Sequence, residues 1–359
     1  MKKTFLILTA LGLFATSCSD DKSDEIANTD TQNKVDMSDF YLYTDADIDE
    51  QNRMANGKSS CYSMVNLNRL LNENKGLNKK MYDIEYNSRV FAANMKPGNG
   101  NGNGNNGGGG SDGGTGGGDT SDNLGVINIP VYVHVIYSNS NENISSSQIN
   151  SQINVLNQDF RKTNSDANSI PSEFSGLAAD SEINFTLANT FRYSNSRTSW
   201  GTNDAMKIAY PPVSPNTHLN IWVCNIGGGI LGYAQFPGGP ASTDGVVVSP
   251  QYFGTTGYVA APFDGGRTLT HEVGHYLNLR HIWGDGRCRQ DDFVADTPSS
   301  DGPNYGCPSY PTVNCRSNDM TMNYMDYTND ACMSMFSSGQ KVRMRSIFAS
   351  GGPRAAMAN

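Results

Sequence analysis

The chemistry of this chain centres on three histidines within eleven residues, His271, His275 and His281. His271 and His275 stand four positions apart, so on a helix both imidazoles leave the same face, one turn apart. Three neutral imidazoles fill three zinc positions and leave the fourth open, as in catalytic rather than structural zinc sites. The spacing therefore predicts a catalytic zinc ion.

Glu272 follows the first histidine directly, where its carboxylate can reach a water on the shared metal. Zinc lowers the pKa of that water, and Glu272 takes its proton as general base. A helix that continued through Asn278 would turn His281 away from the metal. The chain must break there at a residue that tolerates positive φ, which is usually Gly and sometimes Asn. The pattern predicts hydrolysis by metal-activated water.

Length and charge restrict the classes of partner. The chain has 359 residues with 26 Lys+Arg, 35 Asp+Glu and a formal net charge of -9. The cations are scattered, so no basic patch indicates nucleic acid, and the acidic balance disfavours anionic surfaces. The length allows one large domain with appendages, or two domains.

Residues 1–18 have the composition of a targeting segment. Two lysines precede an apolar run from Phe5 to Ala15 that is too short to span a bilayer. Small residues before Cys18 resemble a bacterial lipoprotein signal, which predicts a lipid anchor at Cys18 on the bacterial cell surface or outer membrane. An ordinary cleaved secretory signal is the alternative. In either case the mature chain leaves the cytoplasm, where disulfides are permitted.

Composition divides the rest of the chain into three parts. Residues 19–96 hold apolar side chains at helical spacing from 62 to 93, residues 97–122 form a flexible linker rich in Gly and Asn, and residues 123–359 form the large domain. In that domain the patterns predict helices at 145–161, 267–277 and 339–350, and strands at 126–137, 183–191, 219–226, 231–236 and 245–249. These elements predict a mixed α/β sandwich.

The chain after His281 is rich in loops and cysteines. Four cysteines cluster there and suit two disulfides in a subdomain with little apolar content: Cys288, Cys307, Cys315 and Cys332. The carboxylates between 291 and 296 are either a solvated loop or a calcium site. Cys224 is interpreted as a buried free thiol, and Cys61 stands alone upstream.

A short apolar segment, residues 323–327, follows the loops. Met325 is either simple core or an apolar floor beneath the metal. Tyr327 can offer a phenol to the oxyanion that forms when water attacks a carbonyl. The pocket for the residue after the scissile bond is expected near residues 325–335, where Asp326 or Asp330 would favour a basic side chain and neighbouring apolar residues would not.

The zinc motif, the Met-containing turn and the cysteine set together resemble the pappalysin family of metzincin metallopeptidases. The resemblance is best over about residues 123–350, and it includes 271–281, 296–298, 307–308, 323–327 and 331–333. One departure is Asn278, where the family has Gly. The resemblance implies an α+β, metzincin-type catalytic domain. Its mixed twisted sheet, zinc-binding helix and loop-rich C-terminal subdomain would follow a small helical prosegment.

The resemblance also implies roles for single residues. It implies the disulfides Cys288–Cys315 and Cys307–Cys332, Met325 as the Met-turn residue, and Tyr327 as a transition-state stabiliser. It further implies a calcium ion in the loop that holds Asp292 and Thr297. Finally, it identifies residues 19–96 as a prosegment in which the thiolate of Cys61 occupies the open zinc position, since a thiolate is a strong zinc ligand.

These expectations describe a secreted or surface-anchored zinc endopeptidase that is made as a latent zymogen. Its protein or peptide substrates would pair with an edge strand at Gly232, Tyr233 and Ala234. One alternative is a catalytically silent surface binding lipoprotein on a metzincin scaffold, which the intact Glu272 argues against because a binder needs no general base. The other is a peptidase of another metzincin family, which the cysteine pairing would distinguish.

Overall fold

The computed structural model describes residues 35–46, 60–95 and 122–358. The predictions for the targeting segment, Cys18 and nearly all of the linker lie outside these residues. Among the described residues, no helix is long and apolar enough to cross a membrane.

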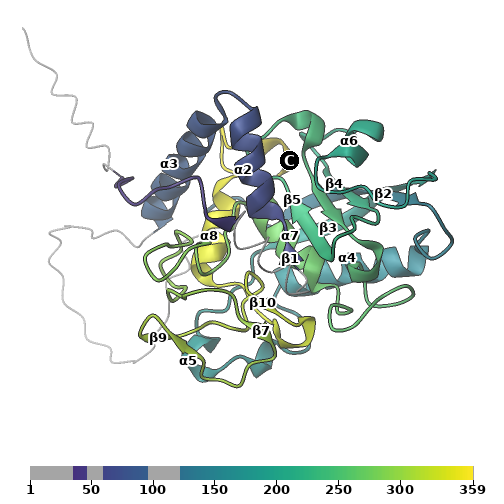
Figure 1. Ribbon diagram of the computed structural model, residues 1–359. Coiled ribbons are helices and arrows are strands. Elements are labelled where there is room, and N and C mark those ends of the chain that lie inside the picture. Colours follow the sequence, from purple (N-terminus) through teal and green to yellow (C-terminus); the bar gives the residue numbers. More distant parts are fainter. Residues whose placement is uncertain (1–34, 47–59, 96–121, 359) are drawn as a thin grey trace, which may run out of the picture. The chain divides into compact units, whose positions relative to one another are not determined.

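Six strands form one mixed sheet in the order β1-β5-β6-β4-β2-β3 (Figure 1). Neighbours run parallel except β5 and β6. The two longest strands, β2 and β3, pair along their whole length, and β2 buries every second residue from Ile127 to Val135 at 0% exposure on the core face of the sheet. The strand bounds are β1 Ser60–Cys61, β2 Ile127–Tyr137, β3 Ile183–Ser194, β4 Leu219–Val223, β5 Ile230–Ala234 and β6 Val246–Val248.

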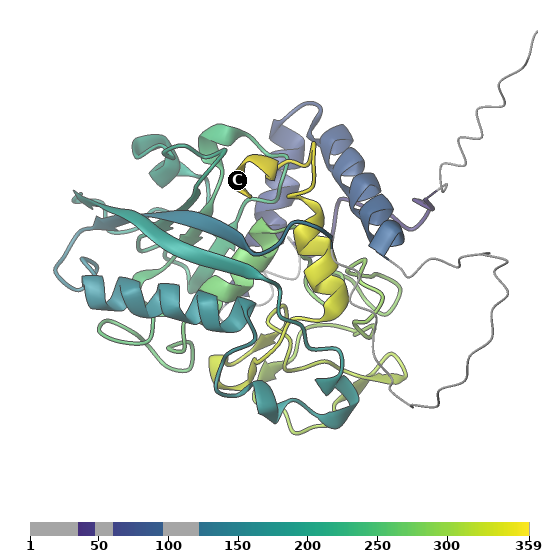
Figure 2. The same ribbon diagram turned by 180° about the vertical axis from the view of Figure 1, so that it is seen from behind.

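Two helices, α4 (Ser146–Phe160) and α7 (Arg267–Tyr276), pack on each other and on this sheet. The Ser145 hydroxyl caps α4 by accepting a hydrogen bond from the backbone N–H of Gln148 at 3.1 Å. Figure 2 shows α4 running alongside the long strands β2 and β3. α7 contacts β5 and β6, so the helix with the first two histidines lies beneath one end of the sheet.

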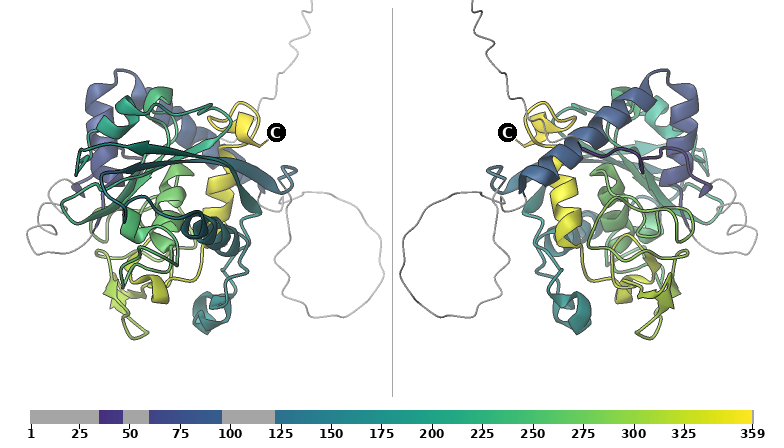
Figure 3. Two further views of the ribbon diagram at one scale, coloured as in Figure 1. Left: turned by 90° about the vertical axis from the view of Figure 1, so that its right-hand side faces the viewer. Right: turned by 90° about the vertical axis from the view of Figure 1, so that its left-hand side faces the viewer.

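The N-terminal part is a helical hairpin of α2 (Ser63–Glu73) and α3 (Leu77–Met95). Its apolar face joins Phe236 of the large domain in one cluster with Met64, Leu67, Leu70, Leu71, Leu77 and Met81. α2 contacts β5, and α3 contacts α8 (Ser338–Ser346), beside which it lies in Figure 3. The small segment therefore folds against the rest of the chain, because a segment of this size cannot bury enough apolar surface by itself.

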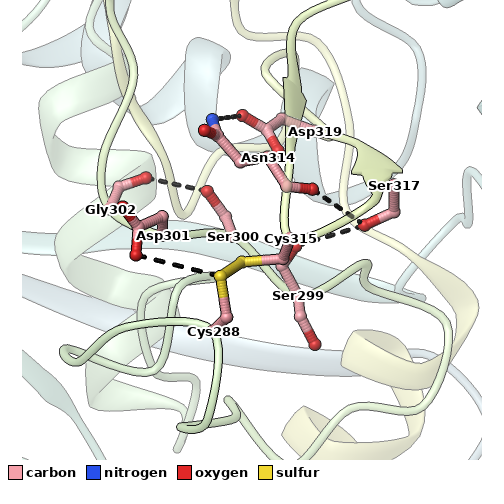
Figure 4. Close-up of a disulfide and its surroundings, with 9 residues drawn as sticks. All are labelled: Cys288, Ser299, Ser300, Asp301, Gly302, Asn314, Cys315, Ser317 and Asp319. Carbon is pink, nitrogen blue, oxygen red and sulfur yellow. Dashed lines mark hydrogen bonds between the residues drawn. A yellow bond between two sulfur atoms is a disulfide. The ribbon is translucent and has the colours of Figure 1, made fainter.

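Short elements and two disulfides build the C-terminal subdomain. Cys288 bonds to Cys315 and Cys307 to Cys332. Figure 4 shows the Cys288–Cys315 bond with the neighbouring residues of the segments 299–302 and 314–319. The remaining elements are α5 Ser172–Ser175, α6 Ala205–Ala209, β7 Tyr305–Gly306, β8 Val313–Asn314, β9 Ser317–Asn318, β10 Tyr327–Thr328, and the 3-10 turns Ala167–Ser169, Ala241–Thr243, Pro250–Tyr252, Asp330–Cys332 and Ala355–Met357.

Several element predictions need correction. β3 extends to Ser194 and not to 191. β4 ends at Val223 and not at 226, because the chain turns into three glycines with positive φ at 227–229. α8 ends at Ser346 and not at 350. β5, predicted as an edge strand, lies between β6 and β1, because the N-terminal segment adds β1 to its open side.

Candidate metal centre

Three histidines converge where α7 ends. His271 and His275 leave the same face of α7, and Asn278, with φ of 78°, turns the chain so that His281 comes back towards them. The break predicted at this residue is confirmed, and Asn adopts the left-handed region without Gly. The Nε2 atom of His275 lies 3.1 Å from the Nε2 atoms of both His271 and His281.

Each of the three rings is held through its other nitrogen. The Nδ1 partners of His271, His275 and His281 are, in that order, Tyr324 O at 2.7 Å, Leu279 O at 2.8 Å and Asp285 Oδ1 at 2.5 Å. Burial lowers the pKa of His271 to about 3 and that of His275 well below its ordinary value. With Nδ1 of each ring held by an oxygen acceptor, the three Nε2 atoms face one another, as in a set of metal ligands.

Cys61 completes the cluster. Its Sγ and one nitrogen of each histidine all lie within 4.8 Å of one another, and all four residues are buried. One sulfur and three imidazole nitrogens form a donor set that suits tetrahedral zinc. The thiol also donates a hydrogen bond to Glu272 Oε2 at 3.3 Å, and burial together with that carboxylate raises the pKa of Cys61.

Ser63 is a site residue that the sequence analysis missed. Its hydroxyl donates to Glu272 Oε2 at 2.7 Å and accepts from the N–H of Ala234 at 2.7 Å. The N–H of Tyr62 donates to Gly232 O at 3.0 Å. Residues 62 and 63 of the N-terminal segment thus form hydrogen bonds both to the Glu272 carboxylate and to the main chain of β5. The one signal in the sequence was that Ser63 follows Cys61 by two positions.

Met325 and Tyr327 belong to the segment 323–327 and lie against α7 and the histidine cluster. Met325 is fully buried beneath α7, where a Cβ at position 274 would clash with its Sδ, so Gly274 is required for this close approach. The phenol of Tyr327 donates to Cys61 O at 3.3 Å, and its ring centre lies 4.9 Å from that of His281. Met325 therefore packs against α7 at Gly274, and Tyr327 lies beside His281 and Cys61.

A pocket lies beside Glu272 between β5, α7 and the segment 326–333. Asp330 lines it, but its Oδ2 accepts hydrogen bonds from the N–H groups of Gly265 at 2.8 Å and Arg267 at 3.1 Å. Asp326 Oδ1 likewise accepts from the N–H of Tyr327 at 2.8 Å. Both carboxylates that were expected to favour a basic side chain are therefore bonded to backbone.

The loop after the histidines brings Asp292 and Thr297 together. The Thr297 hydroxyl donates to Asp292 Oδ1 at 2.8 Å, and Asp292 is buried. Burial and the nearby Asp291 carboxylate raise the pKa of Asp292 well above its ordinary value. A cation at this loop would stabilise the charged form of Asp292.

Comparisons with known proteins agree with this geometry. A family model described as Pregnancy-associated plasma protein-A matches residues 212–349. An extracellular metalloprotease of Arthroderma otae is 33% identical over 63% of this chain and 79% of the relative. Extracellular metalloprotease 1 of Coccidioides posadasii is 35% identical over 62% of this chain and 77% of the relative.

Two solved structures from Tannerella forsythia are also similar. A promirolysin point mutant has a TM-score of 0.63 and 45% identity, covering 65% of this chain and 84% of that chain. Mature mirolysin in complex with a cleaved peptide has a TM-score of 0.63 and 46% identity, covering 65% of this chain and 96% of that chain.

Proposed function

The chain belongs to the pappalysin family of metzincin metallopeptidases and is a zinc metalloendopeptidase, and from this premise we propose how its own residues perform and restrain peptide hydrolysis. We propose that it is a latent zymogen. In this assignment residues 1–18 are the targeting segment, 19–96 the prosegment, 97–122 the linker and 123–359 the catalytic domain.

His271, His275 and His281 hold the zinc in the proposed active enzyme. When bound, zinc lowers the pKa of water and polarises a carbonyl. Glu272 takes the proton of the attacking water and later delivers it to the leaving amine. Tyr327, whose phenol lies at the cluster, donates a hydrogen bond to the developing oxyanion. The substrate main chain pairs with β5 at Gly232, Tyr233 and Ala234 once β1 has left that edge.

Cys61 keeps this machinery latent. The observation that carries the proposal is that its Sγ lies with the three histidine nitrogens inside one 4.8 Å cluster. A thiolate at this place would fill the fourth coordination site of the zinc ion, which the attacking water needs. Ser63 adds a second block, because it engages Glu272 and the N–H of Ala234 at the same time.

We also propose that the protein is exported. Relatives at 33% and 35% identity are named extracellular metalloproteases, and two disulfides stabilise the C-terminal subdomain. Within this proposal, Cys18 is the lipid attachment point at the bacterial surface. Labelling the full chain with a radioactive fatty acid, with Cys18→Ala as the control, tests the anchor.

We propose calcium as a structural cation at Asp292 and Thr297. The buried Asp292 carboxylate supports this, because a hard cation with oxygen ligands would stabilise its charge. Adding calcium to chelator-treated protein should raise its melting temperature, and Asp292→Asn should abolish that increase. An equal increase in the variant would contradict the assignment.

The latch is tested by Cys61→Ala in the full chain. We expect this variant to cleave an unfolded reporter protein before any processing, at least about tenfold faster than wild type, because zinc loses its sulfur ligand. A zinc chelator should stop the cleavage. Cys224→Ala is the matched control, since Cys224 is also a buried free cysteine but lies outside the cluster. Unchanged latency in Cys61→Ala would refute the latch.

A further inference from the structure

A second contact between prosegment and catalytic domain lies on the other face of β5. Gly232 faces α7, since a Cβ there would lie 3.2 Å from Glu272 Oε1. Side chains alternate along a strand, so Tyr233 points to the opposite face, where it packs in a buried cluster with Trp222 and Met206. At the rim of this cluster Asp204 begins α6 with φ of 60°, and its side chain is 3% exposed.

The two oxygens of Asp204 have different partners. Oδ1 accepts from the Tyr233 hydroxyl at 3.2 Å and pairs with Lys207 at 2.9 Å. Oδ2 receives the guanidinium of Arg69, which comes from α2 of the prosegment. Asp204 Oδ1 is therefore bonded to residues of the catalytic domain itself, whereas the cation at Oδ2 comes from the prosegment.

Arg69 reaches this carboxylate along the path that a substrate would follow. One turn earlier on α2, Asn66 donates to Ala234 O at 3.0 Å and accepts from Arg69 Nη2 at 2.6 Å. Asn66 thus occupies the backbone carbonyl of Ala234, which a substrate strand would otherwise use as a hydrogen-bond acceptor. From the next turn of α2, the Arg69 side chain passes the edge of β5 and reaches Asp204. A peptide strand paired with β5 would present alternate side chains to the same place.

We infer that Asp204, with the Tyr233 hydroxyl beside it, is a substrate subsite for an arginine or lysine side chain, which Arg69 fills in the latent chain. The inference rests on the proposed function, since it concerns the same cleft. When Arg69 leaves, Asp204 Oδ2 loses a charged hydrogen-bond donor, and a basic side chain of the substrate replaces it. Ala234 lies two residues along β5 from Gly232, so the subsite serves a position about two residues from the scissile bond.

The test is a cleavage profile of the full chain after it has been cut within residues 97–121 and freed of the prosegment. Peptide libraries that vary the positions on both sides of the scissile bond are digested, and the ratio of kcat/KM for Arg over Gln is measured at each position. We expect a preference of about tenfold at one position near two residues from the bond. Asp204→Asn should reduce that ratio to about one.

Asp180→Asn is the matched control, because Asp180 is a 40% exposed carboxylate of the catalytic domain that pairs with Arg161. Asp180→Asn should keep the wild-type ratio of kcat/KM for Arg over Gln. Because Asp204 also pairs with the buried Lys207, Tyr233→Phe serves as a variant that removes one hydroxyl and keeps the pair. It should lower the ratio several-fold, which keeps the test decisive if Asp204→Asn does not fold.

The outcomes separate the two proposals. Cleavage without a basic preference at any such position, or a preference that persists in Asp204→Asn or Tyr233→Phe, would overturn the subsite and leave the peptidase intact. A zinc-loaded, folded enzyme that cleaves no library peptide would contradict the proposed function itself.

Discussion

At the scale of single residues, the site depends on partners that hold side chains in place. His281 is the ligand outside α7, so its position depends on the turn at Asn278 and on Asp285, whose Oδ1 lies 2.5 Å from its Nδ1. Trp283 stacks on the same ring with centroids 4.3 Å apart. These contacts fix the ring that the helix itself does not position.

Asp285→Asn should weaken zinc binding on the order of 10- to 100-fold, because the carboxylate both orients the imidazole and raises its basicity. Competition with a chromophoric chelator measures the zinc affinity. Asp180→Asn provides the control, as a carboxylate remote from the histidines. An affinity for Asp285→Asn that equals the wild-type value would show that Trp283 and the turn suffice.

Ser63→Ala should weaken latency. The change removes the hydroxyl that joins Glu272 to the N–H of Ala234. We expect prosegment binding to lose about 1–3 kcal/mol, and the unprocessed chain to cleave a reporter roughly tenfold faster. Asn78→Ala, an exposed change on the same hairpin, should leave the rate unaltered. A rate for Ser63→Ala within twofold of wild type would contradict the second block.

At the scale of elements, local sequence patterns predicted most of the helices and strands of the large domain. The periodicity of 145–161 and of 267–277 predicted α4 and α7 within two residues, because each buries one face on the sheet. β1 could not be predicted from two residues, Ser60 and Cys61, because its pairing with β5 depends on chain far away in the sequence. For the same reason the contacts of Ser63 and Arg69 were missed, whereas the three histidines share one short stretch.

A buried ion pair joins the prosegment helix α3 to α8. Glu85, 2% exposed, accepts from Arg343 Nη2 at 2.6 Å, and Arg343 Nε donates to Asn278 O at 2.7 Å. The prosegment is thereby connected to the turn between the second and third histidines. Burial raises the pKa of Glu85, but Arg343 and Arg89 outweigh it and hold the pKa below its ordinary 4.5.

This pair predicts how pH affects docking of the prosegment. Because folding lowers the pKa of Glu85, its contribution is complete above its ordinary pKa and is lost as the pH falls through the lowered value. Glu85→Gln should cost about 3 kcal/mol at neutral pH, since it leaves Arg343 buried without its charge partner. It should also remove part of the acid sensitivity, as thermal unfolding from pH 3 to 7 would show.

Asp83→Asn is the control for that measurement, since Asp83 is a half-exposed carboxylate on the same helix that pairs with Lys79. It should shift the free energy of unfolding by less than about 0.5 kcal/mol. An acid sensitivity of Glu85→Gln identical to that of wild type would contradict the assignment to this pair.

At the scale of the whole molecule, the N-terminal segment that we propose as the prosegment is held by several separate contacts. Cys61 and Ser63 engage the catalytic cluster, Arg69 engages Asp204 beyond β5, and Glu85 engages Arg343 on α8. The N-terminal segment therefore contacts residues on both faces of β5, and through Glu85 and Arg343 it reaches the turn at Asn278. None of these contacts involves the linker, so we expect a cut in the linker alone to release less activity than removal of the whole N-terminal segment.

The most direct test of this account is the zinc coordination of the unprocessed chain, measured by X-ray absorption spectroscopy. We predict three imidazole nitrogens and one sulfur at about 2.3 Å around zinc in the full chain. The sulfur should be lost in Cys61→Ala and after removal of the prosegment, and it should persist in Cys224→Ala. Zinc bound by nitrogen and oxygen alone in the intact, latent chain would contradict the cysteine latch.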